Sequence, residues 1–157
     1  MTQIDPPFLI GVDGGGTGCR AAVATPDGRI LAEGKGGRAN VSTDCATAID
    51  SVLTATRNAI ESAGLDVADM PRAVAHLGLA GYTGPEMGPR VQAGLPFAKS
   101  VVTEDTTTTI VGAVGEQDCH LIALGTGTIV GRQKAGVQTC IGGWCYQVSD
   151  QASGAWL

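Results

Sequence analysis

The chain has 157 residues, enough for one domain with a proper hydrophobic core. Its net charge of −5 and the lack of a basic run argue against a nucleic-acid partner and against an acidic membrane surface. No apolar run approaches the roughly 20 residues that a membrane helix needs, and we expect no signal peptide, because the first residues are polar and too few.

The first predicted strand, residues 8–13, ends on the carboxylate of Asp13 and runs into a glycine-rich tip. Three glycines and a threonine follow: Gly14, Gly15, Gly16 and Thr17. A tip without side chains lets backbone N–H groups approach an anion and surround it. Asp13 is placed to hold a water molecule or a metal ion, and Thr17 to donate its hydroxyl to a phosphate oxygen. The alternative is an ordinary glycine-rich hairpin turn.

A second strand at 19–25, a Pro-Asp-Gly turn and a third strand at 29–34 complete a predicted antiparallel meander. A loop containing Asn40 then leads to a helix that Ser42, Thr43 or Asp44 caps and that ends at Gly64. Its apolar residues share one face at helical spacing: Ile49, Val52, Leu53, Thr56, Ile60 and Ala63.

The next segment alternates strands and helices. We expect a buried strand at 73–80, a weak helix at 85–93, a strand at 99–103 and a helix at 106–114. His76, within the first of these strands, is more often a satisfied strand histidine than a catalyst. The order βββαβαβα is typical of the ribonuclease H-like α/β fold that the actin, hexokinase and heat-shock chaperone ATPases share.

The opening pattern then recurs after a polar turn. Strands are expected at 119–124, 129–133 and 136–141, and the first two are joined by a second Gly/Thr tip that contains Gly125, Thr126 and Gly127. We therefore expect a first domain at 1–116 and the first antiparallel strands of a second, similar domain at 117–157. We expect a new helix to begin near the end of the sequence and therefore expect a continuation after Leu157.

Four motifs in this order resemble the N-acetylglucosamine kinase family, also called the BadF/BadG/BcrA/BcrD ATPase family. They are the 11–17 segment, Asp105 after a strand, the 125–128 segment, and Gly142-Gly143-Trp144 followed by Asp150 and Ser153-Gly154. The resemblance covers almost the whole chain, from Ile10 to Leu157.

The resemblance implies a role for each motif. It implies a first phosphate loop made of Asp13, the Gly14–Gly16 backbone and Thr17. The same residues would surround a Mg²⁺ ion, which Asp13 would hold through a water molecule. Gly125, Thr126 and Gly127 would form the second phosphate loop, and Asp105 would be the catalytic base. The residues that would contact or shape the sugar site are Asn40, Gly143, Trp144 and Asp150.

The implied activity is an ATP- and Mg²⁺-dependent transfer of a phosphoryl group to the 6-hydroxyl of glucosamine or N-acetylglucosamine. Phosphoryl transfer needs positioned phosphates, a metal and a carboxylate that deprotonates the acceptor hydroxyl. Asp105 follows a parallel strand, where α/β sheets place ligand residues. The alternatives are a helix N-cap for Asp105, a turn or capping residue for Asn40 and a helix-start residue for Asp150.

The chain departs from the family pattern near its end. Ser149-Asp150-Gln151-Ala152-Ser153 stands where Gly-Asp-Glu-Gly-Ser is usual, and Cys145 replaces a glycine. We expect the added side chains to narrow or reshape the predicted sugar pocket and so to affect which sugar it accepts.

Two other functions stay open at this point. One is an ATPase that activates a radical dehydratase or a benzoyl-CoA reductase, and the other is a non-catalytic sugar-binding relative. The five scattered cysteines indicate reduced thiols, so we expect a cytoplasmic protein whose partner is a small sugar, with a homodimer left open.

Overall fold

The computed structural model describes residues 7–115, 117–125, 127–142, 148, 151–154 and 156. By contacts the chain divides into unit 1, Met1–Asp105, and unit 2, Thr106–Leu157. Unit 1 contains β1 (Leu9–Gly14), β2 (Cys19–Ala24), β3 (Ile30–Gly36), α1 (Cys45–Ser62), the 3₁₀ helix η1 (Val67–Arg72), β4 (Val74–Leu79), α2 (Gly88–Gln92) and β5 (Lys99–Glu104). The helix α3 (Asp105–Val114) is followed by β6 (Cys119–Leu124), β7 (Thr128–Lys134) and β8 (Val137–Gly142).

The five strands of unit 1 form one mixed sheet in the order β3-β2-β1-β4-β5. The pairs β1–β2 and β2–β3 are antiparallel, whereas β1–β4 and β4–β5 are parallel. This strand order and the element order βββαβαβα confirm the predicted ribonuclease H-like α/β layout.

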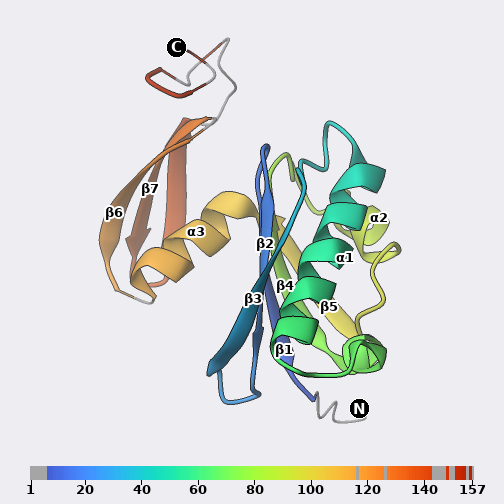
Figure 1. The fold of residues 1–157 in the computed structure, drawn as a ribbon. Coiled ribbons are helices and arrows are strands. Elements are labelled where there is room, and N and C mark those ends of the chain that lie inside the picture. The colour runs from blue at the N-terminus through green and yellow to red at the C-terminus, as the bar shows by residue number, and fades with distance from the viewer. Residues whose placement is uncertain are drawn as a thin grey trace. The chain divides into compact units, whose positions relative to one another are not determined.

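Both helices of unit 1 cover the same face of this sheet (Figure 1). The connections β3-α1-β4 and β4-α2-β5 step across the sheet in the same direction, so right-handed crossovers bring both helices to one side. Gly94, just after α2, lies close to α1: a Cβ built on Gly94 would lie 2.7 Å from Ile49 Cδ1. The core lies between the sheet and α1 and includes Ile10, Leu77 and Ile60.

Glycines in β3 let α1 lie directly on the strand backbone. A Cβ on Gly34 would overlap the Ala55 carbonyl oxygen, and a Cβ on Gly36 would overlap that of Ser51. A hydrogen bond also joins α1 to β3: Asn58 Nδ2 donates to Lys35 O at 2.8 Å. The distance between helix and strand is therefore set by the absence of two side chains.

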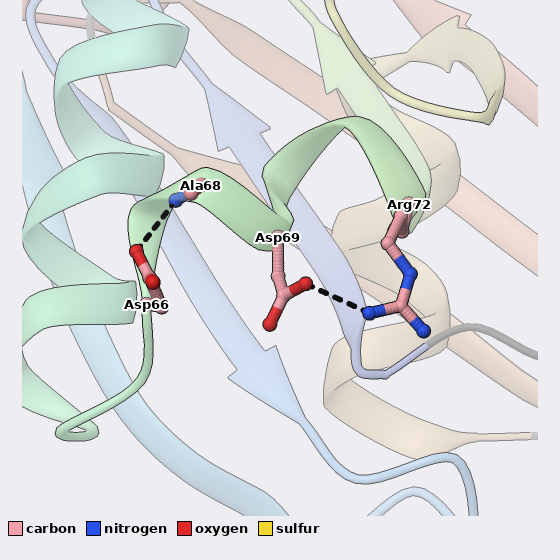
Figure 2. A network of polar contacts seen from close by, with 4 residues as sticks. All are labelled: Asp66, Ala68, Asp69 and Arg72. Carbon is pink, nitrogen blue, oxygen red and sulfur yellow. Dashed lines mark hydrogen bonds and ion pairs between the residues drawn. The ribbon is translucent and has the colours of Figure 1, made fainter.

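The short helix η1 lies between α1 and β4, where the sequence analysis predicted no helix. Figure 2 shows how its side chains hold it: Asp66 Oδ1 accepts from Ala68 N at 2.8 Å, and Arg72 Nη1 pairs with Asp69 Oδ1 at 2.8 Å. The ion pair is solvent-exposed and contributes little, at most about 1 kcal/mol. The helix α2 is also shorter than the predicted 85–93.

Unit 2 holds an antiparallel meander in the order β6-β7-β8. The helix α3 belongs with it by contact: a Cβ on Gly131 would lie 2.8 Å from Ile110 Cδ1, and Gln133 Nε2 donates to Gly115 O at 2.8 Å. The sequence analysis placed α3 in the first domain, with the boundary after residue 116. The boundary between folding domains stays a prediction. None of the helices in the described ranges is long and apolar enough to cross a bilayer.

The contact between Gly34 and α1 yields a test of stability. Gly34→Ala adds a Cβ that overlaps backbone atoms, and no side-chain rotation relieves it, so we expect a loss of about 2–3 kcal/mol in the free energy of unfolding. Urea unfolding followed by circular dichroism measures it. The control is Gly11→Ala on β1, where a Cβ meets nothing within 4 Å and the change stays within about 0.5 kcal/mol. Equal losses in the two variants would contradict this account.

Candidate active site at the carboxyl edge of the sheet

The parallel strands β1, β4 and β5 end at one edge of the unit 1 sheet. Gly14 pairs with Leu79, and Leu79 pairs with Glu104, so the three strands end level with one another. Asp13 and Asp105 therefore lie at the same edge, and two strand spacings, roughly 10 Å, separate the backbones of β1 and β5. Ligands of α/β sheets bind at this kind of edge.

The tip between β1 and β2 is a tight, open turn. Gly15 N donates to Gly18 O at 2.8 Å and closes it. Gly16 and Thr17 are exposed, and a Cβ on Gly16 would meet nothing within 4 Å. Gly14 has a different reason to be glycine: a Cβ there would lie 2.6 Å from Leu79 Cδ2 and 2.9 Å from Ala39 Cβ. Packing thus explains Gly14, and packing does not explain Gly16.

Two titratable groups at the base of this tip have raised pKa values. Desolvation by burial raises the pKa of Asp13, and the positive charge of Arg20, its register partner on β2, partly lowers it. Burial, with the charge of Asp13 as a second cause, raises the pKa of Cys19 to about 12. The negative charge of Asp13 is therefore costly by itself, and a cation or a hydrogen-bond donor beside it would relieve that cost.

The donor set at this tip fits Mg²⁺ held mostly by water and phosphate. Within the described residues no group of three or more His, Cys, Asp or Glu side chains could hold a metal ion. Mg²⁺ commonly uses one or two carboxylates, several waters and the phosphates of its substrate. Asp13 supplies one such carboxylate, so the site suits a metal that arrives with a nucleotide.

The loop before α1 lies across the carboxyl ends of β1 and β4. Ala39 N donates to Gly15 O and Val41 N donates to Ala80 O, both at 2.9 Å. Asn40, between them, forms a turn: its Oδ1 accepts from Ser42 N and Thr43 N. Among the three predicted capping candidates, Asp44 caps α1 by accepting from Thr47 N at 3.0 Å.

His76 points away from the helical face and is exposed. Its Nε2 lies 3.1 Å from Thr103 Oγ1, and that hydroxyl donates to Leu77 O at 3.4 Å. His76 is therefore a strand histidine with a local partner, as the sequence analysis favoured. Gly81 lies against Asn40, a contact that its sequence position, directly after a predicted strand, did not indicate.

The second Gly/Thr tip is packed against the segment that follows β8. Gly125 N donates to Gly127 O at 2.9 Å, Gly154 N donates to Gly125 O at 2.8 Å, and Thr128 Oγ1 donates to Gln151 O at 3.0 Å. Two motifs far apart in sequence are thus brought together within unit 2. Four predicted site residues lie outside the described residues: Thr126, Gly143, Trp144 and Asp150.

Comparison with protein families matches residues 10–157 to the model of the BadF/BadG/BcrA/BcrD ATPase family. The chain belongs to the BadF/BadG/BcrA/BcrD ATPase family. This membership confirms the family that the four sequence motifs indicated.

Among curated relatives of this family member, glucosamine kinase GspK of Vibrio cholerae is 37% identical over 150 residues, covering 94% of this chain and 51% of the relative. An N-acetylmuramic acid/N-acetylglucosamine kinase of Clostridium acetobutylicum is 23% identical and is 49% covered. The chain thus spans about half the length of the curated relatives it matches.

Solved structures agree on the fold. A Chromobacterium violaceum protein described provisionally as an N-acetylglucosamine kinase is 37% identical, with a TM-score of 0.87 over 96% of this chain and 54% of its own. A ROK family glucokinase from Streptomyces griseus, solved with glucose and AMPPNP, has a TM-score of 0.61 at 24% identity, over 84% of this chain and 46% of its own. The second likeness concerns the fold alone.

The raised pKa of Asp13 predicts an unusual dependence of stability on pH. Because the folded state favours the protonated carboxyl, stability falls as pH rises from the usual Asp pKa near 4 through the raised value. Asp13→Asn removes the charge, so without divalent cations it should raise the melting temperature at pH 7, and this gain should vanish below about pH 4. Differential scanning calorimetry with a chelator present measures it.

The control for this prediction is Asp27→Asn. A hydrogen bond from the Thr25 side chain lowers the pKa of Asp27, so its charged form favours the folded state. The control should give no gain at pH 7. A stabilised Asp27 variant, or an Asp13 variant whose gain persists in acid, would contradict the pKa assignment.

Proposed function

We propose that the full-length protein transfers the γ-phosphoryl group of ATP to the 6-hydroxyl of an amino sugar, glucosamine or N-acetylglucosamine. The observation that carries the proposal is the placement of Asp13 and Asp105 at one carboxyl edge of the sheet, beside an open glycine tip. The 37% identity to a glucosamine kinase over 94% of this chain supports the choice of substrate class.

Asp105 is the proposed catalytic base. Its carboxylate would accept the proton of the sugar 6-hydroxyl while that oxygen attacks the γ-phosphorus and the bond to the β,γ-bridging oxygen breaks, which releases ADP. The helix α3 begins at Asp105, so this residue is fixed directly after the end of β5. A capping role for Asp105 is compatible with this one, because the backbone N–H groups of a helix start stabilise a carboxylate.

Each Gly/Thr tip is a proposed phosphate loop. Backbone N–H groups of Gly14–Gly16 and the Thr17 hydroxyl would bind phosphate oxygens at the first tip, and Gly125, Thr126 and Gly127 at the second. Mg²⁺ would neutralise charge on the transferred phosphoryl group, and Asp13 would orient its water shell. Asn40, Gly143, Trp144 and Asp150 are the proposed sugar residues.

A sugar kinase is favoured over an activating ATPase of a radical enzyme. Component A of the (R)-2-hydroxyglutaryl-CoA dehydratase from Acidaminococcus fermentans is similar in fold alone, with 15% identity and a TM-score of 0.51. The relatives at 37% identity are named as amino-sugar kinases. The two-domain boundary after residue 116, a homodimer and a cytoplasmic location stay predictions.

The proposed chemistry is tested by substituting the base. In the full-length protein with ATP and Mg²⁺, we expect sugar-dependent ADP release across a panel of glucosamine, N-acetylglucosamine and glucose. Asp105→Asn should lower kcat by about 10²–10⁴-fold, with KM for ATP little changed, because the amide cannot accept the proton.

The matched control is Asp50→Asn on the exposed surface of α1, which should leave kcat unchanged. No sugar-dependent turnover by the wild-type protein would reject the proposal. Wild-type kcat in the Asp105 variant would reject the assigned base.

A further inference from the structure

The Asn40 side chain is held in one orientation by its own loop. Its Oδ1 accepts hydrogen bonds from Ser42 N at 3.1 Å, Ser42 Oγ at 2.8 Å and Thr43 N at 3.1 Å. A backbone N–H can only donate, so the atom that faces Ser42 N and Thr43 N must be the carboxamide oxygen. The loop therefore decides which way the amide points.

The other end of the same side chain is uncommitted. In the part of the chain that the structure describes, Asn40 Nδ2 makes no hydrogen bond, and the residue is partly exposed. An amide NH₂ group has two donor hydrogens and no acceptor. With its oxygen used by the loop, Asn40 can offer a bound molecule only hydrogen-bond donors.

Gly81, two residues after the end of β4, lies against the loop-facing side of Asn40. Its φ of +75° is in the left-handed region, and a Cβ there would overlap Asn40 Oδ1 and lie 2.5 Å from Ser42 Oγ. Both the backbone angle and the lack of space require glycine. Gly81 thus leaves room for the oxygen end of the amide and for the hydroxyl that holds it.

The position of Asn40 along the edge is fixed as well. Its two chain neighbours are bonded to the ends of β1 and β4, through Gly15 O and Ala80 O, and Ala80 N in turn donates to Gly14 O at 2.7 Å. The donor end of Asn40 therefore belongs to the same rigid edge as Asp13 and the first glycine tip.

We propose that Gly81 and Ser42 are positioning residues that lock Asn40 as a donor toward an uncharged oxygen of the acceptor sugar. The inference rests on the proposed function, because it requires the sugar to lie at this edge. An NH₂ group attracts the lone pairs of a hydroxyl or acetyl oxygen and repels an ammonium group. The site thus discriminates against positive charge at this point of the sugar.

The first test turns the donor end of Asn40 into a hydrogen-bond acceptor and keeps the hydrogen bonds of the loop. Asn40→Asp retains an oxygen for the bonds from Ser42 and Thr43 but replaces the NH₂ group by an accepting oxygen. In the full-length protein we expect a near-normal melting temperature at pH 7. We also expect kcat/KM for glucosamine, relative to N-acetylglucosamine, to rise about 10- to 100-fold, as for a hydrogen bond to a charged group.

Asn40→Ala is the matched control. It removes the loop bonds together with the donors, so it should lower the melting temperature and raise the glucosamine to N-acetylglucosamine ratio less than Asn40→Asp does. An unchanged ratio in Asn40→Asp would overturn the claim that Asn40 discriminates against positive charge on the sugar. A melting temperature as low as that of Asn40→Ala would show that the oxygen does not hold the loop.

The second test needs no activity. Gly81→Ala is made in the wild-type protein and in the Asn40→Ala background, and melting temperatures are compared. If Gly81 makes room for Asn40, its substitution should cost less when the Asn40 side chain is absent. Gly28→Ala is the control, because Gly28 also has a positive φ of +90° but its Cβ would meet nothing within 4 Å.

Equal losses from Gly81→Ala in both backgrounds would overturn the positioning role, as would an equally strong coupling between Gly28 and Asn40. If the wild-type protein phosphorylates no sugar, the proposed function fails. The comparison of melting temperatures in the two backgrounds still decides whether Gly81 positions Asn40. The two failures are thereby distinguishable.

Discussion

The direct contact between α1 and the backbone of β3 is the constraint on which the rest of unit 1 depends. Gly34 and Gly36 carry no side chains, so the helix lies against the strand itself. The chain must then travel from the end of β3 to the start of α1 over the adjacent strand ends. Asn40 lies on that path, bounded by backbone bonds to Gly15 and Ala80. A packing requirement on one face of the sheet thus places a polar side chain at its edge.

The same edge carries the carboxylate of Asp13, whose desolvation the fold offsets only in part. Asp13 is partly desolvated, and Arg20 offsets only part of that cost. Asp105 follows β5 at the same level. Two carboxylates at the end of a parallel sheet suit a ligand that brings its own cation, as a Mg²⁺–nucleotide does. Stability and ligand binding are therefore in opposition at Asp13, which is common at functional sites.

Much of this arrangement could be predicted from the sequence, because it follows from local patterns. Apolar runs between turns indicated the strands, helical spacing indicated α1, and the two Gly/Thr tips indicated a repeated motif. The sequence did not reveal η1, whose Asp66 cap and Asp69–Arg72 pair are local but weak signals. It also could not reveal why Gly81 is glycine, since the reason is a contact with Asn40, far away in sequence. Which strands α3 accompanies likewise depends on long-range contacts, such as that between Gly131 and Ile110.

The raised pKa of the Cys19 thiol, at the base of the first tip, limits the reactivity of this cysteine. Oxidants and alkylating agents attack the thiolate, and a pKa of about 12 leaves almost none of Cys19 in that form at neutral pH. A cation beside Asp13 would remove only the lesser of the two causes, because burial contributes more. The cysteine at the base of the glycine tip therefore serves as a small apolar residue and resists sulfenic acid formation. Oxidative damage to this protein would start at other residues.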